Sequence, residues 1–328
     1  MRLRILLVAL FVTVSLTLFS LASAQDATPP PPPDTSGMDA VVGTPAPLPT
    51  MAARPAPSQT LAGARAAAAL YFNAIPQGTV GLVGVAGATV TAASATWLDT
   101  IIDFFAVEGE GYFGILAAGM EQNPRRDYPL TITVTHNDGS SETLSGTVEI
   151  TTGGFIRQEV TIPPERGYLL DAESERAELA RLEGIFAQVT TERGWDSTGF
   201  MMPIPAALTS PFGAFRVFNA TLNTRHTGWD IRCTTGTPVF ASATGRVVFA
   251  GNLPIRGNHV IIDHGYGVFS GYSHLSVVNV TRGQSVTKEQ VIGMTGATGR
   301  VSGAHFHWEM AVNGQWVDSV QFIEMWQP

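Results

Sequence analysis

Apolar and polar residues alternate along much of the middle of the chain. Residues 130–135, which read Leu-Thr-Ile-Thr-Val-Thr, alternate strictly, and residues 147–150 do the same. This period of two predicts strands that bury one face. Asn-Asp-Gly at positions 137–139, between the two segments, favours a hairpin turn. Because other strand-like segments occur at short spacing, we expect residues 66–165 to form an immunoglobulin-like β-sandwich.

Residues 171–190 have a different spacing, typical of an amphipathic helix. Leu179, Leu182 and Phe186 recur at intervals of three or four residues, so they would lie along one side of a helix. Asp171 can cap the first turn, because its side-chain oxygens can accept hydrogen bonds from free backbone N–H groups. We therefore expect a helix over residues 171–190 that links two domains.

A second strand-rich region covers residues 200–328. Its apolar runs, at 238–241, 246–249 and 259–262, are short and are separated by glycine at turns. Together with the sandwich, this region predicts a mainly β protein with two domains. A chain of 328 residues is long enough to give each domain its own core.

The first 60 residues predict no folded domain. Residues 1–24 combine a basic start, an apolar run and a small-residue exit, which is typical of a cleaved export signal. An uncleaved membrane anchor is the alternative, because the apolar run is nearly long enough to span a bilayer. After cleavage no membrane span would be left. Residues 25–60 hold ten of the chain's 21 prolines and predict a disordered linker. Such a protein would be exported to the periplasm, the cell envelope or the extracellular space.

Composition argues against some partners and cross-links. The net charge of −8 argues against nucleic acid, which requires a basic surface. Cys233 is the only cysteine, so the chain has no internal disulfide. A lone thiol can bind zinc, but we expect Cys233 to be a buried apolar residue.

Histidine is concentrated toward the C-terminus, where six of the seven histidines lie between positions 226 and 307. His305 and His307 are two residues apart in a strand-like segment, so they would share one face. His226 and Asp230 flank a glycine that leaves room for an ion. Two histidines and one aspartate would supply three ligands to a catalytic zinc ion and leave a fourth position for water. Two further histidines could then move protons and stabilise an oxyanion.

We expect the other histidines to be structural. His136 lies at the edge of the predicted hairpin and is interpreted as a surface residue. His264 lies in a glycine-rich turn, and His259 has no partner nearby in the sequence. His274, taken by itself, would more often be a buried and hydrogen-bonded residue than a catalyst.

Four motifs occur in a fixed order along the C-terminal region. They are His226-x-Gly228-x-Asp230, Gly236-Thr237-Pro238-Val239-x-Ala241, Tyr272-Ser273-His274-Leu275-Ser276 and Gly296-x-Thr298-Gly299-Arg300-x-x-Gly303-x-His305-Phe306-His307-Trp308-Glu309. The series resembles the lysostaphin-type (LytM-domain) zinc metallopeptidases, which are bacterial peptidoglycan endopeptidases. The resemblance covers residues 203–318. Ala304 and Phe306 replace the proline and leucine common in that family, and neither is at a ligand position.

The resemblance implies an antiparallel β-sheet with the metal at the floor of a groove between loops. By position, zinc (Zn²⁺) would be held by His226, Asp230 and His307. His274 and His305 would be the catalytic pair. One would polarise the attacking water and the other would stabilise the tetrahedral oxyanion, in an assignment that stays open. The substrate would be the peptide stems or cross-links of peptidoglycan.

Two other functions fit parts of the same sequence. A LytM-like protein without metal could bind and activate another wall hydrolase, although such proteins lack ligand or catalytic residues that are all present here. Alternatively, the sandwich could be a wall-binding module that binds without hydrolysis. In an enzyme, the sandwich could also pack over the groove and control access to it. The sequence identifies no protein partner.

Overall fold

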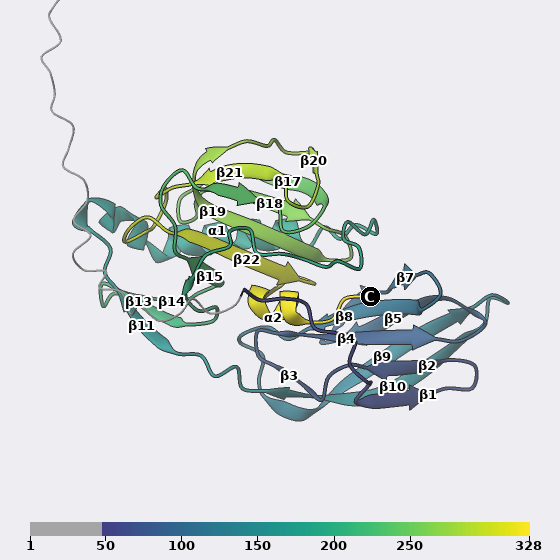
Figure 1. The fold of residues 1–328 in the computed structure, drawn as a ribbon. Coiled ribbons are helices and arrows are strands. Elements are labelled where there is room, and N and C mark those ends of the chain that lie inside the picture. The colour runs from purple at the N-terminus through teal and green to yellow at the C-terminus, as the bar shows by residue number, and fades with distance from the viewer. Residues whose placement is uncertain (1–47) are drawn as a thin grey trace, which may run out of the picture. The chain divides into compact units, whose positions relative to one another are not determined.

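The computed structural model describes residues 48–328. The expected signal at residues 1–24 and the greater part of the expected linker lie outside these residues. Within them the protein is mainly β, as predicted (Figure 1). None of the helices in the described part of the chain is long and apolar enough to cross a membrane.

Two five-stranded sheets make up the first region. Their strands are β1 (Gln59–Ala62), β2 (Ala67–Leu70), β3 (Ala74–Pro76), β4 (Val80–Ala86), β5 (Val90–Trp97), β6 (Thr100–Asp103), β7 (Phe105–Val107), β8 (Gly111–Ala117), β9 (Arg125–His136) and β10 (Ser141–Thr151). One sheet has the order β1-β2-β4-β8-β7 and the other β3-β10-β9-β5-β6. Leu116 from the first sheet and Leu130 from the second are buried in one core. The Trp97 indole N–H donates across the sheets to the Ala117 carbonyl oxygen at 2.7 Å, so the two sheets form a β-sandwich.

The alternating segments form strands where the sequence predicts them. Residues 130–135 lie in β9 and residues 147–150 lie in β10, and the two strands pair antiparallel. Strand β1 starts at Gln59 and so lies partly inside the segment, residues 25–60, that was expected to be disordered. Its side chains are mostly exposed, so it lacks the alternation that would have revealed it.

The remaining strands follow the sandwich and lead to the C-terminus. They are β11 (Arg157–Val160), β12 (Leu208–Ser210), β13 (Phe215–Phe218), β14 (Leu222–Arg225), β15 (Gly228–Ile231), β16 (Pro238–Phe240), β17 (Gly245–Leu253), β18 (Gly257–Asp263), β19 (Val268–Val278), β20 (Ser285–Val286), β21 (Val291–Thr295), β22 (Phe306–Val312) and β23 (Gln315–Val317). A ten-stranded sheet has the central order β12-β15-β22-β19-β18-β17-β20. All of its pairings are antiparallel, as the resemblance implied. A small sheet with the order β11-β13-β14 lies outside it.

Helix α1 (Ala172–Phe186) confirms the predicted helix and its N-cap, but it ends at Phe186 and not at residue 190. The Asp171 side chain accepts hydrogen bonds from two backbone N–H groups of the first turn. Leu182 and Phe186 are buried together with sheet residues such as Phe269 on β19. The helix therefore packs against the ten-stranded sheet, and in Figure 1 it lies behind that sheet. It is more than the link that the sequence suggested.

Two short helices had no signal in the sequence. The 3-10 helix η1 (Pro164–Leu170) precedes α1, and α2 (Ser319–Glu324) follows the last strand. Each is too short to show a helical period. The domain boundaries at residues 66–165 and 200–328 stay a prediction.

Candidate metal centre

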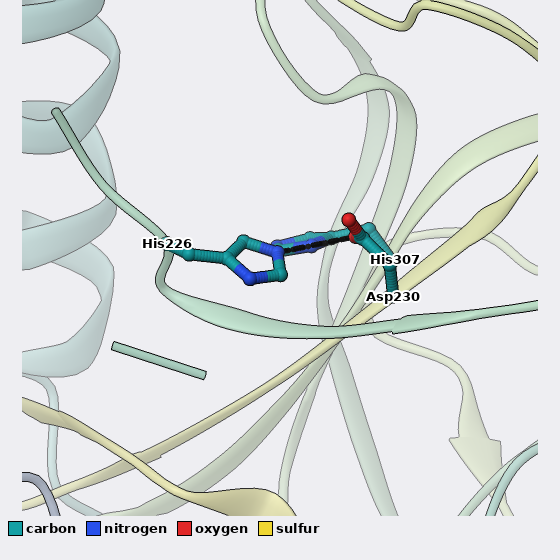
Figure 2. A group of neighbouring side chains, drawn as sticks. All are labelled: His226, Asp230 and His307. Atoms are coloured by element: carbon teal, nitrogen blue, oxygen red, sulfur yellow. Dashed lines mark hydrogen bonds and ion pairs between the residues drawn. The ribbon is translucent and has the colours of Figure 1, made fainter. Parts of the chain in front are cut away.

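Three side chains from different elements meet at one point. His226 follows β14, Asp230 lies on β15 and His307 lies on β22. β15 and β22 pair with Asp230 opposite His307. Nε2 of His226 lies 3.1 Å from Oδ1 of Asp230 and 3.0 Å from Nδ1 of His307. Nδ1 of His307 lies 3.0 Å from the same Oδ1. Figure 2 shows the three groups pointing toward one another.

Gly228 has a different role from the one expected. We predicted that it leaves room for an ion beside His226 and Asp230. A Cβ at this position would lie 2.2 Å from the backbone oxygen of Trp308 on the neighbouring strand. The glycine therefore allows β15 to lie close to β22, and this pairing brings Asp230 to His307.

Hydrogen bonds outside the cluster indicate the tautomer of each imidazole. Nδ1 of His226 lies 2.6 Å from the carbonyl oxygen of Pro211, so Nδ1 carries the proton and Nε2 presents a lone pair. Nε2 of His307 lies 3.3 Å from Oε1 of Glu309 and can donate its proton there, which leaves Nδ1 as the nitrogen that can offer a lone pair to a metal. Burial lowers the pKa of His226 to about 4, which keeps it neutral at pH 7. Two lone pairs and a carboxylate oxygen thus face one point, and this set fits a three-ligand zinc site.

Asp230 is held through its second oxygen. Arg216 donates from Nη2 to Oδ2 of Asp230 and to Oγ of Ser210, the latter at 2.8 Å. Nε of Arg216 donates to Oε1 of Gln158 at 3.4 Å. Burial alone would raise the pKa of Asp230, but its interactions with His226 and with the Arg216 guanidinium outweigh burial and hold this pKa well below its ordinary value. Asp230 is therefore a carboxylate whose Oδ1 faces the cluster.

His305 lies beside the cluster, at the end of a bend. Its Nε2 is 3.5 Å from Oδ1 of Asp230. Its Nδ1 is 3.0 Å from the carbonyl oxygen of Gly303, which places the proton on Nδ1. We expected His305 and His307 on one strand, but β22 begins at Phe306. His305 therefore directly precedes the strand, but its ring and that of His307 both face Oδ1 of Asp230, as the shared face predicted.

His274 completes the group from β19. Its φ of 61° lies in the left-handed region, which is uncommon for a residue with a Cβ and typical of functional sites. Its ring centre is 4.8 Å from that of His305 and 5.9 Å from that of His307. Nδ1 lies 2.8 Å from the carbonyl oxygen of Thr298. Burial, together with the nearby His305 and His307, holds the pKa of His274 well below its ordinary value. The structure thus brings together all five residues that the sequence singled out.

A buried ion network lies behind His307, and the sequence did not predict it. Arg256 donates to both oxygens of Glu309, at 2.5 and 2.8 Å, and to Oε1 of Glu178 on α1 at 2.9 Å. The three side chains are between 1% and 7% exposed. The network positions Glu309, which in turn holds His307. Alternation along β22 puts Glu309 and His307 on one face, and this was the signal available in the sequence.

Helix α1 covers the cluster. A cavity of about 60 Å³ is lined by His226, His274 and His307, and by Glu175 and Leu179 of α1. No residue of β1–β10 is among the lining residues. This cavity is therefore covered in part by α1 and not by the strands of the sandwich. The side chains of the three metal-ligand candidates are only 2% to 10% exposed.

The other histidines do not belong to the group of three. His264 and His259 are buried, and both ring nitrogens of His264 are within hydrogen-bonding distance of oxygen atoms. The expectation that His136 lies at the surface is wrong, because its side chain is 1% exposed and its Nε2 lies 3.2 Å from Oε1 of Glu142. Cys233, which was expected to be buried, is only half-buried, and it also lies outside the group. Burial raises the pKa of its thiol.

Known sequences match the part of the chain that carries these residues. The model of peptidase family M23 matches residues 224–319. The chain is 44% identical over 96 residues to a Vibrio cholerae protein named peptidoglycan DD-endopeptidase ShyA. The matched segment covers 29% of this chain and 22% of that protein. It is 43% identical over 114 residues to the Neisseria meningitidis protein DD-carboxypeptidase/endopeptidase Mpg. That match covers 34% of this chain and 26% of the other protein. The chain thus spans about a quarter of the length of these relatives.

A solved structure is similar over a longer stretch. It is a crystal structure from Pseudomonas aeruginosa, provisionally described as a peptidase M23. The TM-score is 0.58 at 25% sequence identity, and the match covers 76% of this chain and 95% of the other. The similarity of fold therefore extends well beyond residues 224–319.

Proposed function

Because residues 224–319 form a domain of peptidase family M23, we propose that the protein is a zinc-dependent endopeptidase. Its substrates would be peptide bonds in the stems or cross-links of peptidoglycan. One observation carries the proposal, namely that ligand atoms of His226, Asp230 and His307 lie within 4.8 Å of one another. The names of the relatives, peptidoglycan DD-endopeptidase and DD-carboxypeptidase/endopeptidase, support the substrate class.

The zinc ligands would be Nε2 of His226, Oδ1 of Asp230 and Nδ1 of His307. Zinc bound there would act as a Lewis acid toward water and the scissile carbonyl group. Three protein ligands leave one position open, as hydrolysis requires. Arg216 and Glu309 hold two of the ligands from behind, and such outer contacts keep ligands correctly oriented.

His274 and His305 would share the proton transfers. In both rings a backbone carbonyl oxygen holds the proton on Nδ1, so Nε2 presents a lone pair. A neutral imidazole of this kind can accept the proton that the attacking water loses. The imidazolium so formed can then donate a hydrogen bond to the oxyanion or give the proton to the leaving amine.

The proposed substrate also indicates where the protein would act. Peptidoglycan lies outside the cytoplasmic membrane, so its hydrolysis requires export. We propose that the protein acts in the cell envelope and that the signal predicted at residues 1–24 directs it there. The names of the relatives as peptidoglycan endopeptidases favour the same location.

Hydrolysis of purified peptidoglycan by the full chain tests the proposal. The wild-type protein should hold about one zinc per chain and release peptides. His307→Ala should lose both the zinc and the activity. His305→Ala should keep the zinc and lose activity by roughly 10²- to 10⁴-fold, since it removes an acid–base group. Peptide release by His307→Ala at the wild-type rate would contradict the proposal. Binding of wild-type protein to peptidoglycan without any release would favour the regulator or wall-binding module.

A further inference from the structure

A carboxylate from α1 lines the cavity above the proposed zinc site. Oε2 of Glu175 lies 2.7 Å from Nη1 of Arg300 and Oε1 lies 3.2 Å from Nη2, so the guanidinium donates to both oxygens. Oε1 also accepts a hydrogen bond from the hydroxyl of Thr224. The side chains of Glu175 and Arg300 are only 11% and 6% exposed. His274 and His307 line the same cavity.

This cavity cannot hold a peptide while α1 covers it. Its volume is about 60 Å³, whereas ligand pockets usually measure about 300 to 1,000 Å³. A peptide that reaches His274 and His307 through this cavity therefore requires the part of α1 that carries Glu175 and Leu179 to move away. This movement would take the carboxylate of Glu175 away from Arg300.

Arg300 would then line the opened groove without the only carboxylate that it pairs with in the described part of the chain. Its Cζ lies 4.3 Å from the centre of the Phe218 ring, and this contact would keep the guanidinium facing the groove. A guanidinium that already binds one carboxylate through two nitrogens is suited to bind another. The other arginines that line the cavity keep ion-pair partners outside α1, namely Arg216 with Asp230, Arg225 with Glu121 and Arg256 with Glu309.

We propose that Arg300 binds a carboxylate of the peptide substrate, and that Glu175 takes the place of this carboxylate while the groove is closed. The inference rests on the proposed function, because it assumes that a peptide enters the groove. The ligand class is a peptide with a free carboxylate near the bond that is cut, at its C-terminus or on a side chain. An amide at the same position would leave Arg300 without a charged partner, so the groove would select the acid.

A simple latch is the competing account, and it makes a different prediction. In a latch, Arg300 only holds α1 down, so the loss of either partner would open the groove and speed hydrolysis equally. If Arg300 also binds substrate, Glu175→Ala should speed hydrolysis of an acidic peptide. Arg300→Met should not, because it removes the residue that recognises the peptide.

The test uses the zinc-loaded full chain and two synthetic peptides. One peptide carries a free carboxylate at the tested position, and the other carries an amide there. In Glu175→Ala, kcat/KM for the acid should exceed that for the amide on the order of tenfold to a hundredfold. In Glu175→Ala/Arg300→Met this ratio should fall close to unity. Arg300→Lys keeps the positive charge but cannot bind a carboxylate through two nitrogens, so it should give an intermediate ratio. It serves as a second variant if the methionine variant does not fold. Glu183→Gln removes an exposed carboxylate from the same helix and should behave as wild type.

Either of two results would overturn the inference. One is an Arg300→Met rate equal to that of Glu175→Ala, and the other is an acid preference that survives the loss of Arg300. A binding measurement distinguishes these failures from a failure of the proposed function. Acetate should raise the Tm of Glu175→Ala but not that of Glu175→Ala/Arg300→Met. If neither wild type nor Glu175→Ala cuts any peptide, the proposed function fails and the acetate effect alone decides whether the carboxylate site stands.

Discussion

The two β regions differ in what they bury. Among the residues of β1–β10, His136 is the only buried polar or charged residue, and the core consists of side chains such as Trp97 and Leu130. The C-terminal sheet and α1 bury many charged or titratable groups. They include Glu175, Glu178, His226, Asp230, Arg256, His259, Asp263, His264, His274, His307 and Glu309.

This difference separates stability from function. An apolar core favours folding by the hydrophobic effect, so the sandwich needs no further explanation for its interior. Buried charges are unfavourable unless they are paired, and even then an apolar substitute is often as stable. Several of these groups, among them His274 and Glu309, lie beside His226, Asp230 and His307, and this concentration indicates a site that folding alone would not require.

Replacement of Arg256 should have the largest effect. Arg256→Met would leave Glu178 and Glu309 buried without their cation, at a cost of about 3 to 5 kcal/mol in the free energy of unfolding. Because Glu309 holds His307, zinc affinity should also fall by roughly 10- to 100-fold. Urea unfolding and zinc titration measure the two effects. Unchanged zinc affinity in a folded Arg256→Met protein would show that the network is structural only.

Replacement of Trp97 tests the other half of the comparison. Trp97→Ala removes a large side chain that is 2% exposed in the core of the sandwich, which should cost about 3 to 5 kcal/mol of stability. The folded fraction should nevertheless bind zinc with wild-type affinity, because Trp97 contacts none of the proposed ligands. A weaker zinc site in this variant would mean that the sandwich supports the metal centre, and the contrast between the two regions would fail.

Acid should destabilise the C-terminal region through its buried histidines. Burial lowers the pKa of His264 to about 4, whereas the unfolded chain titrates near pH 6.5. Between these values the unfolded state binds more protons, so stability is greatest above about pH 6.5 and falls as the pH approaches 4, by at most about 3 kcal/mol for this residue. His264→Gln should reduce this dependence when unfolding is measured from pH 7 to pH 4. An identical pH profile for both proteins would contradict the effect.

The sequence predicted most of what depends on local pattern. Alternation predicted the strands at residues 130–135 and 147–150, and helical spacing predicted α1. These signals are local because strand and helix periods are short. The five candidate site residues came instead from the resemblance that the motifs carry.

Contacts between distant segments escaped prediction. Arg256 meets Glu178 and Glu309 only because α1 packs against the sheet and β22 lies inside it. Glu175 likewise reaches Arg300 across a long stretch of chain. Sheet order and helix docking decide these pairs, and neither can be read from the spacing of residues along the chain.

Anomalous scattering at the zinc edge, from crystals of the zinc-loaded full chain, tests the central claim most directly. We predict one strong peak, at about 2.0 to 2.2 Å from Nε2 of His226, Oδ1 of Asp230 and Nδ1 of His307. A peak at Nε2 of His307, at Cys233 or at another place would contradict the assigned tautomers or the assigned ligands. The absence of a peak from the cluster would contradict the metal site itself.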